Sequence, residues 1–188
     1  ADAVMTGSHH QSGTERIAEV IEALEFSDEE LIVNLQGDEP CMPGELVRQT
    51  AYLLDDTSID MATLAMPLTD LYDIDSSNVV KIVLDRKHFA MYFSRAAIPY
   101  DRTGTIRSNL TTSDANKHAY LKHIGIYAYR VKFIKKLRML PPSPEEKMES
   151  LEQLRALWHG YKIKVGLANV PIGPGVDTMD ELKFAEDW

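Results

Sequence analysis

Short apolar runs alternate with amphipathic segments along this chain, and that alternation limits its fold more than any other feature. Residues 30–36 form a mostly apolar run that stops at Gly37, which is typical of a strand buried on both faces. Before it, Ser12 and Glu15 have capping-box spacing and precede an apolar stripe of helical period, which predicts a helix over residues 13–25. Strands that alternate with helices favour an α/β sheet.

The rest of the chain continues this pattern. Residues 145–159 predict the clearest helix, with a core stripe of Met148, Leu151, Leu154 and Trp158 and a stop at Gly160. Adjacent strands within residues 79–129 predict a smaller antiparallel lobe, and the polar stretch 101–117 predicts a loop or lid. Further strands are expected at residues 61–66, 79–84, 90–93, 118–129 and 162–168.

Composition excludes several classes of protein. The chain has 188 residues, 44% of them hydrophobic, which suits one core or a core with a small subdomain. A net charge of -9 argues against a surface for DNA or RNA. Cys41 is the one cysteine, so a disulfide framework is excluded and a reducing cytoplasmic setting fits. No run approaches the ~18 apolar residues of a membrane helix.

The strongest local motif follows the strand at residues 30–36. Open α/β sheets bind ligands beyond the carboxyl ends of their strands, where Gln36, Asp38 and Glu39 are expected to stand. A hard cation bound to a triphosphate needs one or two protein carboxylates there, and Asp38 is the first candidate. The alternative is an ordinary turn, because Gly, Asp and Pro gather in turns for backbone reasons.

A second acidic loop contains Asp177. Capping of the following helix would explain this residue, yet Thr178 and Glu181 already form a capping box, so Asp177 falls one residue outside the helix. Asp38 and Asp177 together make a plausible Mg2+ pair, and neither alone is specific.

Polar side chains on the strand around residue 125 could line a ligand. Alternation places His123, Tyr127 and Tyr129 on one face, with His123 and Tyr127 about 13 Å apart at ~3.3 Å per residue. Half-buried packing is the alternative for these rings. Arg95 ends its strand and could clamp a carboxylate, or it could be solvated.

Six motifs in order along almost the whole chain resemble those of the CMP-Kdo synthetase family, the 3-deoxy-manno-octulosonate cytidylyltransferases. The motifs are His10-Gln-Ser-Gly-Thr-Glu-Arg16, Asn34-Leu-Gln-Gly-Asp-Glu-Pro40, Tyr92-Phe-Ser-Arg-Ala-Ala-Ile-Pro99, His123-Ile-Gly-Ile-Tyr127, Leu151-Glu-Gln-Leu-Arg155 and Gly175-Val-Asp-Thr178.

The resemblance implies a single nucleotide-diphospho-sugar transferase domain, a Rossmann-like three-layer α/β fold whose smaller lobe, residues 79–129, contributes to sugar binding and to a homodimer. It implies a cytoplasmic enzyme that converts CTP and Kdo to CMP-Kdo and pyrophosphate for lipopolysaccharide assembly. Matched by position, the expected site residues are Ser12, Gly13, Arg16 and Gln36 for the nucleotide, Asp38 and Asp177 for Mg2+ and catalysis, and Arg95, His123, Tyr127, Glu152 and Gln153 for the sugar acid.

The family also has an N-terminal strand and a basic loop of the form RLPGKPL, and neither precedes the first motif here. Either the sequence covers part of a longer protein, or the chain is a shortened, inactive homologue that acts as a binding or dimerisation module. A cytidylyltransferase for another sugar acid, of the sialic-acid type, is the remaining alternative.

Overall fold

A computed structural model of the chain describes residues 2–10, 12–110, 119–176 and 178–186. The strands are β1 (Leu31–Asn34), β2 (Met61–Pro67), β3 (Lys81–Leu84), β4 (Ala90–Ser94), β5 (Leu121–Arg130) and β6 (Lys164–Leu167). The helices are α1 (Gly13–Ala23), α2 (Gly44–Tyr52), α3 (Leu71–Asp75), α4 (Thr105–Ser108), α5 (Val131–Met139), α6 (Pro144–Glu149), α7 (Gln153–Trp158) and α8 (Met179–Glu186).

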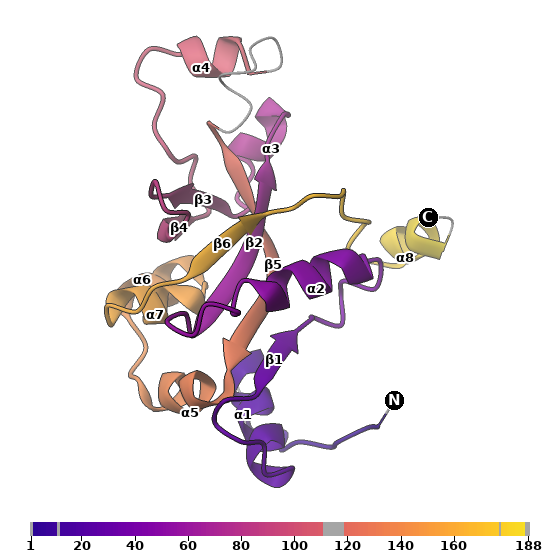
Figure 1. Cartoon of the computed structure of the whole chain (residues 1–188). Coiled ribbons are helices and arrows are strands. Elements are labelled where there is room, and N and C mark those ends of the chain that lie inside the picture. The colour runs from indigo at the N-terminus through magenta and orange to yellow at the C-terminus, as the bar shows by residue number, and fades with distance from the viewer. Residues whose placement is uncertain (1, 11, 111–118, 177, 187–188) are drawn as a thin grey trace.

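One mixed sheet organises the chain (Figure 1). Its strand order is β4-β3-β5-β2-β6, and β1 pairs with β5 off this path. The long strand β5 runs antiparallel to β1, β2 and β3, whereas β2 and β6 are parallel. The antiparallel pairing predicted for adjacent strands within residues 79–129 is confirmed for β3 and β4, which form a hairpin. The predicted α/β fold is therefore observed, with β5 as the strand that joins its parts.

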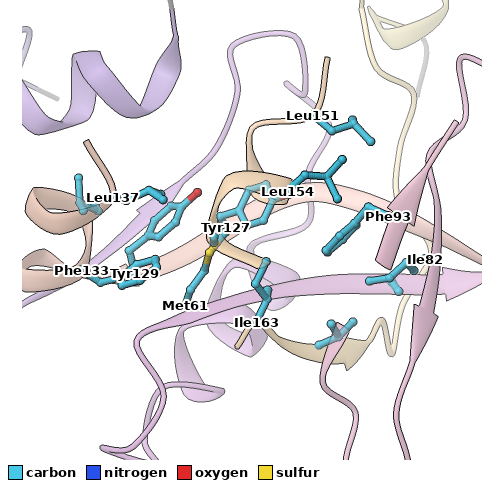
Figure 2. Close-up of a cluster of buried hydrophobic side chains, with 14 of the residues drawn as sticks. Met61, Ile82, Phe93, Tyr127, Tyr129, Phe133, Leu137, Leu151, Leu154 and Ile163 are labelled. Atoms are coloured by element: carbon cyan, nitrogen blue, oxygen red, sulfur yellow. The ribbon is translucent and has the colours of Figure 1, made fainter. Parts of the chain in front are cut away.

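Helices cover both faces of this sheet and give it three layers. On one face, α1, α5 and α7 pack over a cluster that includes Met61, Tyr127 and Tyr129 (Figure 2). On the other face, α2 buries Leu46 against Leu64. Neighbouring residues of a strand point to opposite faces, so the two clusters use alternating positions of β2 and β5. None of the helices that the structure describes has the length and apolar character needed to cross a bilayer.

The predicted helix over residues 145–159 is wrong. Helix α6 ends at Glu149, Ser150 takes a left-handed conformation with φ 54°, and α7 begins only at Gln153. The predicted core stripe is correspondingly half right: Leu151 and Leu154 are buried, but Met148 is 85% exposed. The break redirects the chain, because a left-handed residue ends the α-helical hydrogen-bond pattern.

A charge pair joins the two short helices. Ser143 and Glu146 form a capping box at the start of α6. The guanidinium of Arg155 on α7 donates to both carboxylate oxygens of Glu146, over 2.9 and 2.5 Å, and neither side chain exceeds 14% exposure. Such bidentate pairs fix geometry as well as charge. The pair therefore holds α7 against α6 across the break.

We expect Arg155→Met to lower the free energy of unfolding by about 3 kcal/mol, because it leaves the carboxylate of Glu146 buried without its partner. Urea denaturation measures this difference. The matched control is Arg138→Met, which breaks the more exposed pair with Glu22 and should change stability far less. Equal losses in the two variants would contradict a structural role for the pair.

Candidate active site

A cavity of about 180 Å³ opens where the start of α1, the end of β1, strand β5 and the α6–α7 junction meet. Five of the residues predicted for substrate binding line it. Gly13 and Gln36 come from the predicted nucleotide set, and Tyr127, Glu152 and Gln153 from the predicted sugar set. Residues far apart in sequence thus form one concave site, which is the usual form of a small-molecule pocket.

Stacked aromatic rings form one wall of this cavity. The rings of Tyr127 and Tyr129 stack with centroids 5.7 Å apart (Figure 2). The Tyr127 hydroxyl is enclosed and has no hydrogen-bond partner among the described residues. Burial raises the pKa of Tyr127 well above its usual range, with smaller contributions from Tyr129 and Glu152. A neutral phenol that is buried without a partner can donate a hydrogen bond to a ligand.

His123 extends the aromatic row beyond Tyr127. Its ring lies 5.2 Å from the Tyr127 ring and 5.1 Å, edge to face, from Phe93. On a regular strand the two residues would be about 13 Å apart. Here the β2–β5 pairing shifts register between Thr63 and Leu64, so β5 is irregular between His123 and Tyr127. The irregular strand lets the His123 and Tyr127 rings come into contact.

The surroundings of His123 hold it neutral. His123 is half-buried and lines a second cavity of about 360 Å³, while Phe93 and Tyr127 pack against its ring. This burial lowers the pKa of His123 to about 3, because it penalises the charged imidazolium. At neutral pH the side chain is therefore an uncharged ring.

A hydrogen bond links the motif predicted to bind the nucleotide to the motif predicted to bind the sugar acid. The Thr14 hydroxyl, on the first turn of α1, donates to the Glu152 carboxylate over 2.8 Å. Glu152 precedes α7 only because the chain breaks at Ser150, so the break places this carboxylate at the cavity.

Residues at the start of α1 cap the helix themselves. The Ser12 side chain caps the helix by accepting from the backbone N–H of Glu15 over 3.3 Å. A Cβ atom on Gly13 would lie 3.7 Å from the amide nitrogen of Gln36, so the bare backbone of Gly13 faces that amide. The Arg16 guanidinium donates to Thr6 and to the carbonyl of Gly7 instead of lining the cavity.

Arg95 makes protein contacts outside the described lining of both cavities. Its guanidinium donates to the backbone carbonyls of Glu149 and Ser77, over 2.8 and 2.9 Å. Its backbone N–H donates to the Glu149 carboxylate, and its carbonyl accepts from the buried amine of Lys81. These bonds tie the end of β4 to the helix break at Ser150.

The loop after β1 meets the second acidic loop through the backbone. The N–H of Val176 donates to the carbonyl of Asp38 over 2.7 Å, and Gly175 lies against Asp38 and Glu39. Asp177 lies outside the described residues. Within those residues, no group of three His, Cys, Asp or Glu side chains could hold a metal ion. Mg2+ bound to phosphates needs fewer protein ligands than that.

Sequence reasoning missed several residues that line the cavity. Thr14 and Arg155 stand within the motifs that carry the family resemblance, so those motifs contain a signal for both residues. Ser150 carried no signal, because an α-helical stripe runs across it. Asn34 ends β1 beside Gln36, and its place at the cavity follows from the direction of that strand.

Known proteins are similar to this chain over nearly its whole length. A sequence model of the cytidylyltransferase family matches residues 1–163. The 3-deoxy-manno-octulosonate cytidylyltransferase of Proteus mirabilis is 51% identical over 96% of this chain and 70% of its own length. That of Tolumonas auensis is 49% identical over 97% of this chain and 70% of its own length.

Solved structures agree with the sequence relatives. A CMP:2-keto-3-deoxy-manno-octonic acid synthetase complexed with CTP superposes with a TM-score of 0.81 at 36% identity, covering 98% of this chain and 73% of that one. A 4-diphosphocytidyl-2C-methyl-D-erythritol synthase from Anaerococcus prevotii, at 14% identity and a TM-score of 0.53, shares the fold. With the fold, the cavity and these relatives in agreement, the chain belongs to the cytidylyltransferase family.

Proposed function

We propose that this protein activates the eight-carbon sugar acid Kdo with CTP, giving CMP-Kdo and pyrophosphate for lipopolysaccharide assembly. Relatives at about half identity bear the name of this activity, and the structural relative was solved with CTP. The observation that supports the proposal is the cavity itself, whose lining brings together Gly13 and Gln36, proposed for the nucleotide, and Tyr127 and Glu152, proposed for the sugar acid.

The chemistry of the lining suits a polyhydroxylated ligand. The enclosed Tyr127 hydroxyl has a proton to donate, and the Glu152 carboxylate can accept from a sugar hydroxyl while Thr14 holds it. Gln153 is buried beside them and offers both a donor and an acceptor. Fixed polar groups of this kind give a site its selectivity for hydroxyl groups.

The reaction is an in-line displacement at phosphorus. The anomeric hydroxyl of the sugar acid attacks the α-phosphorus of CTP, a new O–P bond forms, and the bond to the β-phosphate oxygen breaks. The hydroxyl loses its proton and pyrophosphate leaves. Little covalent chemistry falls to the protein in such a transfer, so the residues of the cavity act by orienting the two substrates.

Mg2+ is the proposed cofactor, with Asp38 and Asp177 as its ligands. The bond from Val176 to Asp38 supports the pairing, because it ties the two acidic loops together next to Asp177. Bound there with the triphosphate, Mg2+ would supply neutralisation of the phosphate charge. Arg16 and Ser12 are proposed to complete the nucleotide site, and Arg95 the sugar site.

The remaining expectations extend the proposal to assembly and location. We propose a homodimer whose contacts include the smaller lobe at residues 79–129. Exposed apolar side chains on β4, among them Met91 at 62% and Tyr92 at 36% exposure, support a contact in that region. We also propose that the enzyme works in the cytoplasm.

A comparison of sugar acids tests the activity. We expect pyrophosphate release from CTP in the presence of Kdo and much less with sialic acid, because the cavity of about 180 Å³ is small and its donors are fixed. A coupled pyrophosphate assay with both acids, with CTP and ATP as alternative nucleotides, measures this. Preferred turnover of sialic acid would move the protein to the other sugar-acid class, and binding of neither acid would refute the proposal.

Tyr127→Phe should separate stability from function. Removing an enclosed hydroxyl without a partner should raise the free energy of unfolding by about 1 kcal/mol, and losing its bond to substrate should lower kcat/KM for Kdo about tenfold. Tyr129→Phe is the matched control, since the Tyr129 hydroxyl is not among the buried groups that lack a partner, so its removal should bring no gain in stability. Urea denaturation and kinetics give both values, and a stability loss in Tyr127→Phe would contradict the assignment.

Asp38→Ala and Asp177→Ala should each abolish most turnover and weaken the response of the rate to added Mg2+, while leaving the unfolding midpoint unchanged. Asp55→Ala, which removes an exposed carboxylate elsewhere on the surface, is the control and should keep full activity. Full turnover by either test variant would refute the Mg2+ assignment.

A further inference from the structure

The irregular pairing of β2 and β5 leaves one buried hydroxyl at the centre of three polar groups. Thr63 is fully buried, and its hydroxyl oxygen lies 2.7 Å from the carbonyl oxygen of Ile126 and 3.2 Å from that of Ile124. The same oxygen lies 3.0 Å from Nε2 of His123. The register of the two strands shifts between Thr63 and Leu64, which is why these groups converge there.

The proton count of this cluster has one solution. A carbonyl oxygen can only accept, and an O···O distance of 2.7 Å is that of an O–H···O hydrogen bond. The single proton of the Thr63 hydroxyl is therefore directed to Ile126. The hydroxyl has no second proton for His123, so Nε2 of His123 must carry a proton and donate it to the Thr63 oxygen.

This proton assignment leaves the opposite ring nitrogen as an acceptor. A neutral imidazole protonated at Nε2 has a lone pair on Nδ1. Burial of His123, which depresses its pKa, keeps a second proton off the ring at neutral pH. Nδ1 has no hydrogen-bond partner among the residues that the structure describes. His123 lines the second cavity, and its ring contacts that of Tyr127, which lines the first cavity, where the sugar acid is proposed to bind.

We propose that Thr63 is a positioning residue that fixes His123 as its Nε2–H tautomer, so that Nδ1 accepts a hydrogen bond from a hydroxyl of the sugar acid. An acceptor at Nδ1 repels a carboxylate, so His123 selects a hydroxyl, and the acid group of the substrate binds to other residues. The ligand named here rests on the proposed function, whereas the tautomer does not.

Nitrogen NMR of the ring tests the tautomer directly. In the ¹⁵N-labelled protein at neutral pH, Nε2 of His123 should give the signal of a protonated nitrogen and Nδ1 that of an unprotonated one. Thr63→Ser retains the hydroxyl and should preserve this pattern, whereas Thr63→Val should mix the tautomers. A protonated Nδ1 in the wild type, or an unchanged pattern in Thr63→Val, would overturn the proposal. If Thr63→Val does not fold, the wild type and Thr63→Ser decide.

Steady-state kinetics tests the consequence for the substrate. Thr63→Val should raise KM for the sugar acid about tenfold, leave KM for CTP near the wild-type value, and be rescued by Thr63→Ser. Equal changes in both KM values would indicate a general disturbance and contradict the positioning role. Failure of the wild type to use any sugar acid would refute the proposed function alone, because the NMR measurement would still report the tautomer.

Discussion

The pairing of β5 with its neighbours is the constraint on which the rest of the structure depends. This strand bonds to β2 along one edge, and along the other edge to β1 at one end and β3 at the other. Its pairing therefore positions both the hairpin of β3 and β4 and the loop after β1, which carries the motif proposed for the nucleotide. Hydrogen bonds to three other strands hold β5 along its length, so the side chains that it carries are well suited to define a site.

A second constraint acts where the two short helices α6 and α7 meet. Glu149 ends α6 and accepts from Ser94 and from the backbone of Arg95, so the hairpin is anchored at this point. Lys81, fully buried, donates to the Arg95 carbonyl and to two others. Three donations satisfy all the protons of an ammonium group, which is how a buried lysine can be tolerated.

Local signals in the sequence predicted the parts of the fold that depend on neighbouring residues. The capping positions Ser12 and Thr178 were predicted, and both caps are present. Binary patterning gave the alternation of strands and helices, and the resemblance gave the three layers. Of the site, Gly13, Gln36 and three residues of the sugar set could be named in advance and do line one cavity.

The remaining features depend on contacts between distant segments, which periodicity does not encode. The break at Ser150 lies under an apolar stripe, and Arg95, which follows β4, donates hydrogen bonds to the adjacent residue Glu149. The contact of the His123 and Tyr127 rings needs an irregularity that only the pairing with β2 produces. The hydrogen bonds that Arg95 donates to Glu149 and Ser77 likewise come from segments outside its strand, while its contact with substrate stays a prediction.

The hydrogen bond from Thr14 to Glu152 connects the residues proposed to bind the nucleotide with those proposed to bind the sugar acid. Thr14 follows the residues proposed for the nucleotide, and Glu152 is proposed to contact the sugar acid. If bound nucleotide orders the first turn of α1, the bond from Thr14 would also order the Glu152 carboxylate, which is proposed to receive the sugar acid. Such coupling is reciprocal by thermodynamic necessity, so each substrate would bind more tightly to protein that already holds its partner. A bond of ordinary length would thereby favour a filled site over a half-filled one.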